Sequence, residues 1–333
     1  MADARSAPES LPPAFLEFLQ ENGLDPMMYS MVDTIPRYIR LKPGMEPQIP
    51  EIQSELKCHL NKVSWLPDFY AIPPQVQIAS SMAYQQGKIY GIDAASGAAV
   101  LALDVQPGEH VLDLCAAPDM LGGRGSLTGV DVAKHRLAAC RTMLQKYSLG
   151  DRCRLFVADG TSFSILPVNS SLGNGEGLVG LHKCDALRPS ADDEAQTSGY
   201  DKVLVDAECT HDGSIKHIQK FEFWGWKTLD RRVLDAERTD DLLHLQLRLL
   251  TNGFKLLKTG GSLVYSTCSL TVAQNENVVQ QFLCKHSSAE LQKIGSADSW
   301  PCRSGSIFKT LRFDPATSQT SGLFVAKFTK LQI

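Results

Sequence analysis

From residue 110 onward, short apolar segments alternate along the chain with longer segments of helical periodicity. This alternation is typical of a mostly parallel sheet covered by helices, because each parallel connection needs a crossover. The segments predicted as strands are 110–114, 126–130, 152–158, 202–205 and 262–268. The segments predicted as helices are 134–147, 236–258 and 275–284. Two further strands, at 308–313 and 322–329, are expected to close the sheet as an antiparallel pair.

The composition of the 333 residues changes along the chain, which predicts three parts. Residues 1–30 are expected to be a flexible N-terminus with a short helix. Residues 31–95 contain short apolar runs interrupted by prolines, which predicts a small α+β module. Residues 96–333 form the α/β domain. Within it, residues 161–198 are rich in Ser, Gly, Asn and acids and are expected to form a weakly structured surface insert.

The composition argues against several classes of protein. Hydrophobic residues make up 43% of the chain and charged residues 21%, which is ordinary for a soluble globular protein. There is no apolar run of about 18 residues, and the N-terminus lacks the apolar core of a secretory signal. The nine cysteines include no CxxC pair, which disfavours a disulfide framework or a structural zinc site and favours reduced, intracellular thiols. The net charge of −4 weighs mildly against a large nucleic-acid footprint.

Acids and a thiol follow the predicted strands at the point where each strand ends. These residues are Asp131, Asp159, Asp206 and Cys268. A single acid there is often a helix cap, and a lone cysteine is more often a small buried hydrophobe. Four such positions in one sheet instead predict a ligand-binding edge, since the carboxyl ends of parallel strands face the ligand. An acid after the second strand typically binds ribose hydroxyls, so an adenosine-containing cofactor is expected.

Six motifs occur in a specific order along the chain. They are DLCAAP (113–118), VDVAKHRL (130–137), ADGT (158–161), LVDAEC (204–209), LLKTGGSLVYSTCSLTVAQNE (256–276) and GLFVAK (322–327). In content and order they resemble the RNA (cytosine-5)-methyltransferases of the RsmB/Nop/Sun type over residues 85–330. The resemblance implies an α/β fold of the class I methyltransferase (Rossmann-like) kind, with a mostly parallel sheet. It also implies that residues 31–95 are a small RNA-positioning module.

The resemblance assigns chemical roles to individual residues. Cys268 matches the nucleophile that attacks the base, Asp206 matches the acid of the cytosine pocket, and Cys209 matches the second cysteine, which helps to release the product. The implied cofactor is S-adenosyl-L-methionine, with no metal. The cofactor-binding residues would be Cys115, Ala116, Ala117, Pro118, Asp131, Arg136, Asp159 and Asp206. The implied partner is RNA (tRNA or rRNA), bound by a monomer in the cytoplasm or in the nucleus or nucleolus.

The chain departs from the family pattern at two places. Glu208 stands where the family has a proline before the second cysteine, which adds a charge beside the predicted pocket. The turn after the first strand is also short, because only 13 positions separate Pro118 from Asp131. The Gly-Gly-Lys-Thr turn and helix of the family would need about 7 residues more. The Gly-Gly-Arg at 122–124 either replaces that turn or leads into the second strand.

Two functions stay open on the sequence alone. The first is methylation of cytosine carbon 5 in RNA, dependent on S-adenosylmethionine and proceeding through a cysteine–base covalent intermediate. The second is a catalytically weak or inactive RNA-binding or assembly protein, or a shortened isoform, that keeps the methyltransferase fold. The short turn favours the second, because a glycine-rich turn at a helix N-terminus normally approaches the cofactor. A dehydrogenase is disfavoured, because no GxGxxG follows the first predicted strand.

Overall fold

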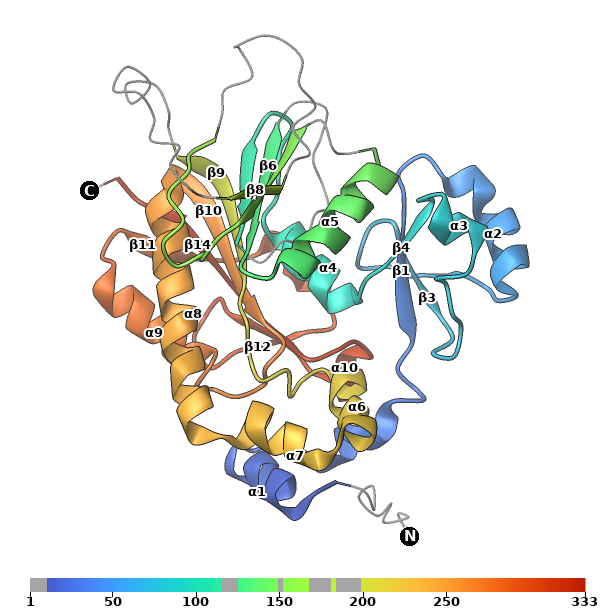
Figure 1. The fold of residues 1–333 in the computed structure, drawn as a ribbon, viewed down its shortest axis with the longest axis horizontal. Coiled ribbons are helices and arrows are strands. Elements are labelled where there is room, and N and C mark those ends of the chain that lie inside the picture. The colour runs from blue at the N-terminus through green and yellow to red at the C-terminus, as the bar shows by residue number, and fades with distance from the viewer. Residues whose placement is uncertain (1–10, 115–124, 149–151, 168–180, 184–198, 333) are drawn as a thin grey trace.

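A large, mostly parallel sheet forms the centre of the molecule, and helices cover both of its faces (Figure 1). The computed structural model describes residues 11–114, 125–148, 152–167, 181–183 and 199–332. The strand order is β12-β13-β14-β10-β9-β5-β6-β7-β8, and β11 also pairs with β14. The strands are β5 His110–Asp113, β6 Ser126–Asp131, β7 Cys153–Val157, β8 Leu181–Lys183, β9 Tyr200–Asp206, β10 Leu257–Thr267, β11 Ala289–Gln292, β12 Arg303–Ser304, β13 Leu311–Phe313 and β14 Leu323–Lys330.

The direction of strand addition reverses between β5 and β9. From β5 the chain adds β6, β7 and β8 on one side, and it then returns to place β9 and β10 on the other side, all parallel. β14 runs antiparallel along β10. A reversal of this kind opens a binding position at the carboxyl ends of the two central strands.

The helices bury apolar residues against the two faces of this sheet. The helical elements are α1 Pro13–Glu21, η1 Pro26–Met31, η2 Glu46–Gln48, α2 Ile49–Leu56, α3 Met82–Gln85, α4 Ala94–Ala102, α5 Lys134–Lys146, α6 Ile215–Trp224, α7 Trp226–Leu229, η4 Asp230–Leu234, α8 Ala236–Leu256, α9 Glu276–Lys285, η5 Gly295–Ser299 and α10 Pro315–Ser318. α8 and α9 pack on the face that carries Val203 and Val205. α4 packs on the opposite face against Leu204 and Val264. The strand period of two therefore sends successive residues of β9 into different cores.

A smaller antiparallel sheet stands beside the large one and forms the N-terminal module. Its order is β2-β3-β1-β4, with β1 Arg37–Leu41, β2 Asn61–Lys62, β3 Phe69–Ile72 and β4 Ile89–Gly91. This module has its own apolar core, to which α2 and α3 contribute. Phe69 and Leu66 also pack against α4, so the module is attached to the large sheet through apolar contacts.

Residues 11–30 contain the expected short helix, α1, but they differ from the expectation of a flexible segment. Phe15 and Leu19 of α1 are fully buried, and they pack with Ile218 and Phe221 of α6. The hydroxyl of Tyr29 donates to the carbonyl oxygen of Asp212 at 2.7 Å. The segment is ordered because its apolar side chains pack against α6, a long-range contact that local composition does not reveal.

Other differences between the predicted and observed structure concern helices and strands whose sequences have weak hydrophobic periodicity. β8 lies inside the expected surface insert at 161–198 and extends the edge of the sheet. The helices α6 and α7 were not predicted from the sequence. The expected strand at 308–313 forms only as β13, after residue 310.

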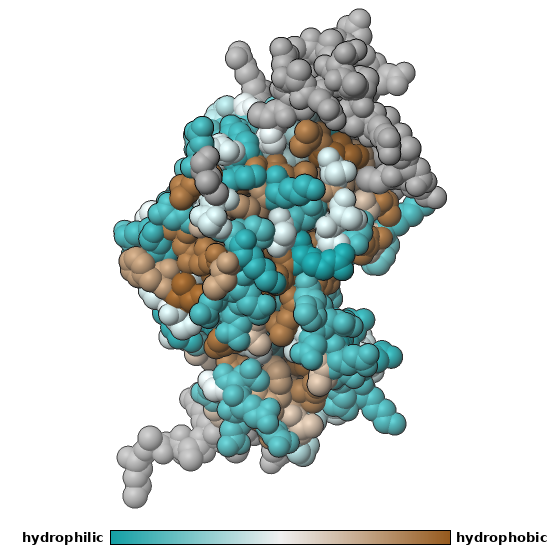
Figure 2. Space-filling model, turned by 90° about the vertical axis from the view of Figure 1, so that its left-hand side faces the viewer, coloured by the Kyte–Doolittle hydropathy of each residue, from teal (hydrophilic) through white to brown (hydrophobic). Residues whose placement is uncertain are grey.

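The face of the molecule in Figure 2 carries hydrophilic side chains between separate apolar patches. Within the described part of the chain, none of the helices combines the length and apolar character that crossing a bilayer requires.

Candidate active site

The strand-end residues expected from the sequence lie along one edge of the large sheet. β6 ends at Asp131 and β9 ends at Asp206. Asp159 follows β7 by two residues, and Cys268 directly follows β10. Four further residues that were expected to bind the cofactor lie outside the described residues: Cys115, Ala116, Ala117 and Pro118.

Two thiols and an imidazole meet at this edge. Sγ of Cys209 lies 3.4 Å from Sγ of Cys268. Nδ1 of His211 lies 2.9 Å from Sγ of Cys268 and 3.7 Å from Sγ of Cys209. Cys209 is only 1% exposed, whereas Cys268 and His211 are half-buried. A ligand therefore meets the pair from the side of Cys268.

The three groups alter one another's acidity. Burial raises the pKa of the Cys209 thiol, but hydrogen bonds with Cys268 and His211 oppose this effect and bring the pKa to about 6. Burial lowers the pKa of His211, but its contact with Cys209 raises it to about 9. The hydrogen bond with Cys209, together with burial, raises the pKa of Cys268 well above its usual value. Near neutral pH the two thiols therefore share one negative charge beside a cationic imidazole.

The pKa directions and the geometry point to different sulfurs as the site of this charge. The pKa directions place it on Cys209, whereas the shortest contact of the imidazole is with Cys268. We favour a proton shared between the thiols, because the two sulfurs are in hydrogen-bond contact and titrate as a pair. Transfer of that proton to Cys209 leaves Cys268 as a thiolate.

The backbone of the loop that carries Cys209 and His211 is tightly constrained. His211 has a φ of 58°, in the left-handed region that few residues other than glycine adopt. A Cβ at Gly213 would lie 2.6 Å from the carbonyl oxygen of Cys268. Glycine therefore allows the loop to approach the backbone of Cys268, and the Gly213 N–H donates to that carbonyl at 2.9 Å.

Buried polar side chains fix the loop against the segment that follows β10. The Thr210 N–H donates to Oε1 of Gln274 at 3.1 Å, and Nε2 of Gln274 donates to Oγ1 of Thr210 at 2.9 Å. The Leu270 N–H donates to Oδ2 of Asp212 at 2.7 Å. Oγ1 of Thr267 donates to Oδ1 of Asn275 at 2.6 Å. Satisfied buried networks of this kind hold functional groups in one arrangement.

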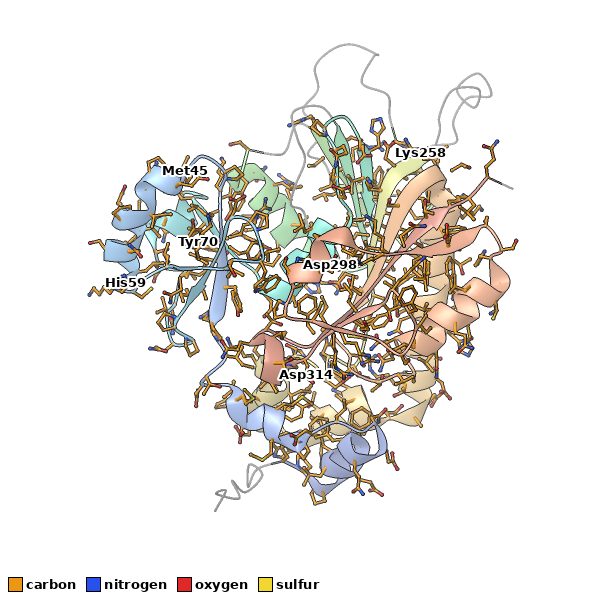
Figure 3. The ribbon with its side chains drawn as sticks, turned by 180° about the vertical axis from the view of Figure 1, so that it is seen from behind. Met45, His59, Tyr70, Lys258, Asp298 and Asp314 are labelled. Atoms are coloured by element: carbon orange, nitrogen blue, oxygen red, sulfur yellow. The ribbon has the colours of Figure 1, made fainter. Side chains whose placement is uncertain are left out.

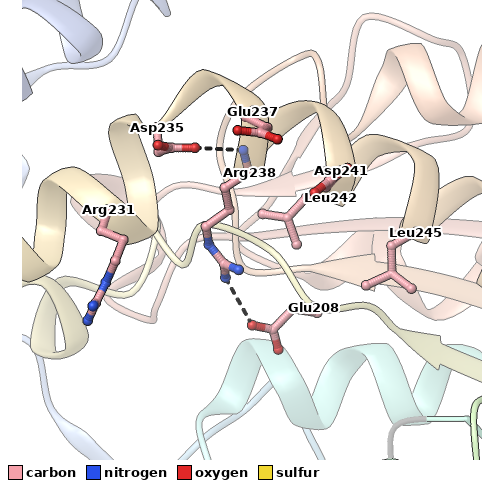
Figure 4. A pocket seen from close by; sticks show the side chains of 8 residues that line it. All are labelled: Glu208, Arg231, Asp235, Glu237, Arg238, Asp241, Leu242 and Leu245. Atoms are coloured by element: carbon pink, nitrogen blue, oxygen red, sulfur yellow. Dashed lines mark hydrogen bonds and ion pairs between the residues drawn. The ribbon is translucent and has the colours of Figure 1, made fainter.

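Glu208 connects this loop to two helices through charged contacts. One of its carboxylate oxygens lies 3.4 Å from Nη2 of Arg238 on α8 and 3.9 Å from Nε2 of His211. Its other oxygen lies 3.8 Å from Nη1 of Arg136 on α5. Figure 4 shows Arg238 extending from the start of α8 toward Glu208, at the wall of an open polar pocket. The carboxylate that replaces the family proline therefore faces the ring nitrogen of His211 opposite the thiols.

Asp206 and Ser266 face each other across β9 and β10. Oγ of Ser266 donates to Oδ1 of Asp206 at 2.8 Å, and the two residues are paired in the parallel register. Asp206 is exposed at the sheet edge. The protein packed around it nevertheless desolvates the carboxyl and raises its pKa, against the effect of the Ser266 hydrogen bond.

The acids at the ends of β6 and β7 fit an adenosine-containing cofactor. Oδ1 of Asp131 accepts from the Ala133 N–H at 2.6 Å, and its Oδ2 lies 3.0 Å from Nε of Arg136. Oδ1 of Asp159 accepts from the Thr161 N–H at 2.8 Å. These contacts orient two carboxylates at neighbouring strand ends, where ribose hydroxyls and an adenine amino group could donate to them.

The thiol–imidazole cluster also has the composition of a site for a soft metal ion. The ligand atoms of Cys209, His211 and Cys268 lie within 4.8 Å of one another. Thiolate and imidazole ligands suit zinc. A metal bound there would cover Sγ of Cys268, so assays of this site need a chelator.

Comparison with known proteins identifies the family. Residues 177–329 match the family described as 16S rRNA methyltransferase RsmB/F. A mitochondrial tRNA (cytosine(34)-C(5))-methyltransferase from Mus musculus is 31% identical over 240 residues, which cover 72% of this chain. The chain belongs to the RsmB/Nop/Sun family of RNA (cytosine-5)-methyltransferases. The resemblance predicted from the motifs is thereby confirmed.

Other members of the RsmB/Nop/Sun family extend the match. A 28S rRNA (cytosine-C(5))-methyltransferase from Mus musculus is 28% identical over 80% of this chain, and a tRNA (cytosine(49)-C(5))-methyltransferase from Pyrococcus abyssi is 27% identical over 83%. The chain covers 59% and 52% of the two mouse proteins and 82% of the archaeal one. It therefore spans little more than half the length of the two mouse relatives.

Solved structures of this kind share the fold. NSun6 from Pyrococcus horikoshii superposes with a TM-score of 0.71 at 16% identity, covering 98% of this chain and all of that one (100%). A methyltransferase homologue from the same organism has a TM-score of 0.63 at 24% identity, covering 96% and 100%. The predicted class I methyltransferase fold is confirmed.

Three features of the site were not predicted from the sequence. His211 was not among the expected residues, although its position two residues after Cys209 was a usable signal. The contact of Glu208 with Arg238 joins residues 30 positions apart. The loop geometry that turns His211 toward Cys268 depends on a left-handed backbone conformation at His211, which the sequence does not predict.

Proposed function

We propose that this chain methylates carbon 5 of cytosine in RNA through a covalent bond between Cys268 and the base. The observation that carries the proposal is the meeting of Cys268, Cys209 and Asp206 at the carboxyl edge of β9 and β10. The relatives are named as enzymes of this activity on tRNA and rRNA. The assembled thiol pair also favours an enzyme over a protein that merely keeps the fold.

Cys268 makes the target carbon reactive. Carbon 5 of cytosine is a poor nucleophile, and addition of a thiolate at carbon 6 gives it enamine character, so that it can attack a methyl group. The target base must be unpaired or flipped out to allow this approach. His211 supports the thiolate, because its cationic ring contacts Sγ of Cys268 at 2.9 Å.

Asp206 serves the opposite side of the pyrimidine. Its raised pKa lets the carboxyl hold a proton that N3 of cytosine accepts as carbon 6 is attacked. Ser266 orients the carboxyl from the neighbouring strand. Cys209 then acts after methylation as the base that removes the proton from carbon 5, which allows Cys268 to leave carbon 6. Because Cys268 is by then bonded to carbon 6, the proton that the two thiols shared first leaves Cys209 for solvent, and the contact with His211 stabilises the resulting Cys209 thiolate.

S-adenosyl-L-methionine would supply the methyl group. Asp131, with Arg136 beside it, would accept from the ribose hydroxyls, and Asp159 would accept from the adenine amino group. Cys115, Ala116, Ala117 and Pro118 are proposed to complete the cofactor site, as are the neighbouring atoms of Asp206.

The direct test is formation of 5-methylcytidine. The whole chain is incubated with unmodified tRNA and rRNA, S-adenosylmethionine and a chelator, and the digested RNA is analysed by mass spectrometry. We expect 5-methylcytidine that depends on the cofactor. Its absence from every RNA, together with intact RNA binding, would favour the non-catalytic alternative.

Calorimetry with S-adenosylmethionine tests the short turn between Pro118 and Asp131 separately. We expect weak binding, because the expected glycine-rich turn and helix are largely missing from the sequence. A family-length insertion between Pro118 and Gly122 should tighten it. If the unaltered chain already binds in the micromolar range, the Gly-Gly-Arg at 122–124 serves as the cofactor turn and the shortened-isoform alternative is wrong.

The pH profile of adduct formation should report the thiol–imidazole cluster. With RNA that contains 5-azacytidine, the rate should rise as the pH passes about 6, where the thiol pair loses a proton, and fall above about 9, where His211 loses its own. His211→Ala should lower the rate at neutral pH by about 10²-fold. It should also shift the rise in rate to a higher pH, because the contact with His211 that lowers the pKa of Cys209 is lost. Asp298→Ala, which removes an exposed ion pair with Lys293 outside the N-terminal module (Figure 3), is the control. If the pH profile of adduct formation is unchanged in His211→Ala, His211 does not support the thiolate.

A further inference from the structure

α6 presents an aromatic and cationic surface next to the candidate active site. The helix follows the loop that carries Cys209 and His211 and lies beyond the carboxyl edge of the sheet (Figure 1). Phe223 is 86% exposed and Trp224 is 51% exposed. A single exposed aromatic is ordinary, but two adjacent ones beside a reactive site indicate a surface made for contact.

Helical spacing gathers these rings with two lysines. Lys216, Lys220 and Trp224 follow one another at intervals of four residues, and Phe223 lies beside them, so all four share one face of α6. We call this face the α6 surface. Nζ of Lys220 lies 5.8 Å from the centre of the Trp224 ring. Lys216 donates to the carbonyl oxygens of Ile35 and Pro36, so Lys220 supplies the positive charge beside the rings. The acid of the helix, Glu222, falls on a different face.

A chain of ring contacts connects the α6 surface to Cys268. The ring of Trp224 lies 5.7 Å from that of His217, and His217 lies 5.0 Å from His211. His211 in turn contacts Cys268. Burial and the charges of His211 and Lys220 lower the pKa of His217 to about 4, so this intermediate ring is uncharged near neutral pH.

We propose that Trp224 and Phe223 form a stacking platform for the unpaired RNA base that neighbours the target cytosine, while Lys220 contacts the adjoining phosphate. The proposal rests on RNA being the substrate. Exposed rings combined with cations are the features by which proteins hold single-stranded nucleic acid, since every base has a face that can stack. A base held there would position the next nucleotide toward Cys268, because the ring contacts lead from one to the other.

The test combines protein and RNA changes in a double-mutant cycle. The affinity of the whole chain is measured by fluorescence anisotropy, without cofactor, for a short single-stranded RNA with one cytosine. Matched RNAs carry an abasic site on either side of that cytosine. Trp224→Ala should weaken binding of the intact RNA about 10-fold, and Trp224→Phe should restore most of it. The abasic site should weaken binding to the unaltered protein by a similar factor, but should add little in Trp224→Ala.

The matched control is Phe308→Ala. Phe308 is 80% exposed, but its neighbour Lys309 contacts Leu291 of β11 rather than the site. Equal RNA affinity of Trp224→Ala and unaltered protein would overturn the proposal, as would an abasic penalty of equal size in both. The proposal would also be overturned if sedimentation shows that the chain self-associates, and if the double variant Phe223→Ser, Trp224→Ser abolishes this self-association without changing the RNA affinity.

These outcomes separate the platform from the proposed catalysis. If the coupling between Trp224 and the neighbouring base is found but no 5-methylcytidine forms, the platform stands and the catalytic proposal fails. If 5-methylcytidine forms with an unchanged KM for RNA in Trp224→Ala, the catalytic proposal stands and the platform is excluded.

Discussion

Cys268→Ala is expected to abolish methyl transfer to RNA and to eliminate the covalent adduct with RNA that contains 5-azacytidine. The thiol is the group that is placed to attack carbon 6, and without that attack carbon 5 stays unreactive. A loss of at least about 10³-fold in kcat is expected, as for other residues that form covalent intermediates. The measurements are methyl incorporation from labelled cofactor and gel electrophoresis under denaturing conditions.

The control for this variant is Cys284→Ala. Cys284 is an exposed free cysteine at the end of α9, away from the sheet edge that carries the site. It should leave both readouts unchanged. Retained turnover in Cys268→Ala would exclude this residue as the nucleophile, and Cys209 would then be the thiol to examine next.

Cys209→Ala should have the opposite effect on the covalent complex. The hydrogen bond with Cys209 is the largest cause of the raised pKa of Cys268. Its removal should lower that pKa and leave more thiolate to attack the base. Release should fail, because the base that removes the carbon 5 proton is missing. Ordinary RNA should therefore accumulate in a complex with the protein that resists denaturant, provided that cofactor is present.

The double variant Cys209→Ala, Cys268→Ala supplies the control, since it has no nucleophile and should trap no RNA. If Cys209→Ala traps no more RNA than the unaltered chain, its thiol does not act in release. Glu208 would then be the group to examine, because its carboxylate lies within 3.9 Å of His211 and replaces the family proline.

The sequence predicted the parallel sheet and the residues at its carboxyl edge because both follow from local pattern. Apolar runs of strand length end in an acid or a thiol, and the intervening helices carry clear apolar faces, as in α5 and α8. The positions of Asp131, Asp206 and Cys268 at one edge then follow from the parallel topology alone.

The remaining features depend on contacts that local pattern does not encode. α1 is ordered because Phe15 and Leu19 pack on α6, about 200 residues later in the chain. His211 reaches Cys268 only through a left-handed backbone conformation next to Gly213. The turn after β5, on which the expectation of weak cofactor binding rests, lies outside the described residues.

The loop between β9 and α6, which carries Cys209, His211 and Gly213, contacts parts of the chain that are synthesised at different times. Tyr29 donates to the carbonyl of Asp212 across 183 positions, and the Gly322 N–H donates to the carbonyl of Gly213 at 2.8 Å, just before β14. Cys268 is translated before β14, the strand that follows this last contact. A nascent or prematurely terminated product that ends between residues 268 and 322 therefore carries both cysteines without the contact of Gly322 that holds the loop. The arrangement of the two thiols therefore depends on residues that are added to the chain after both of them.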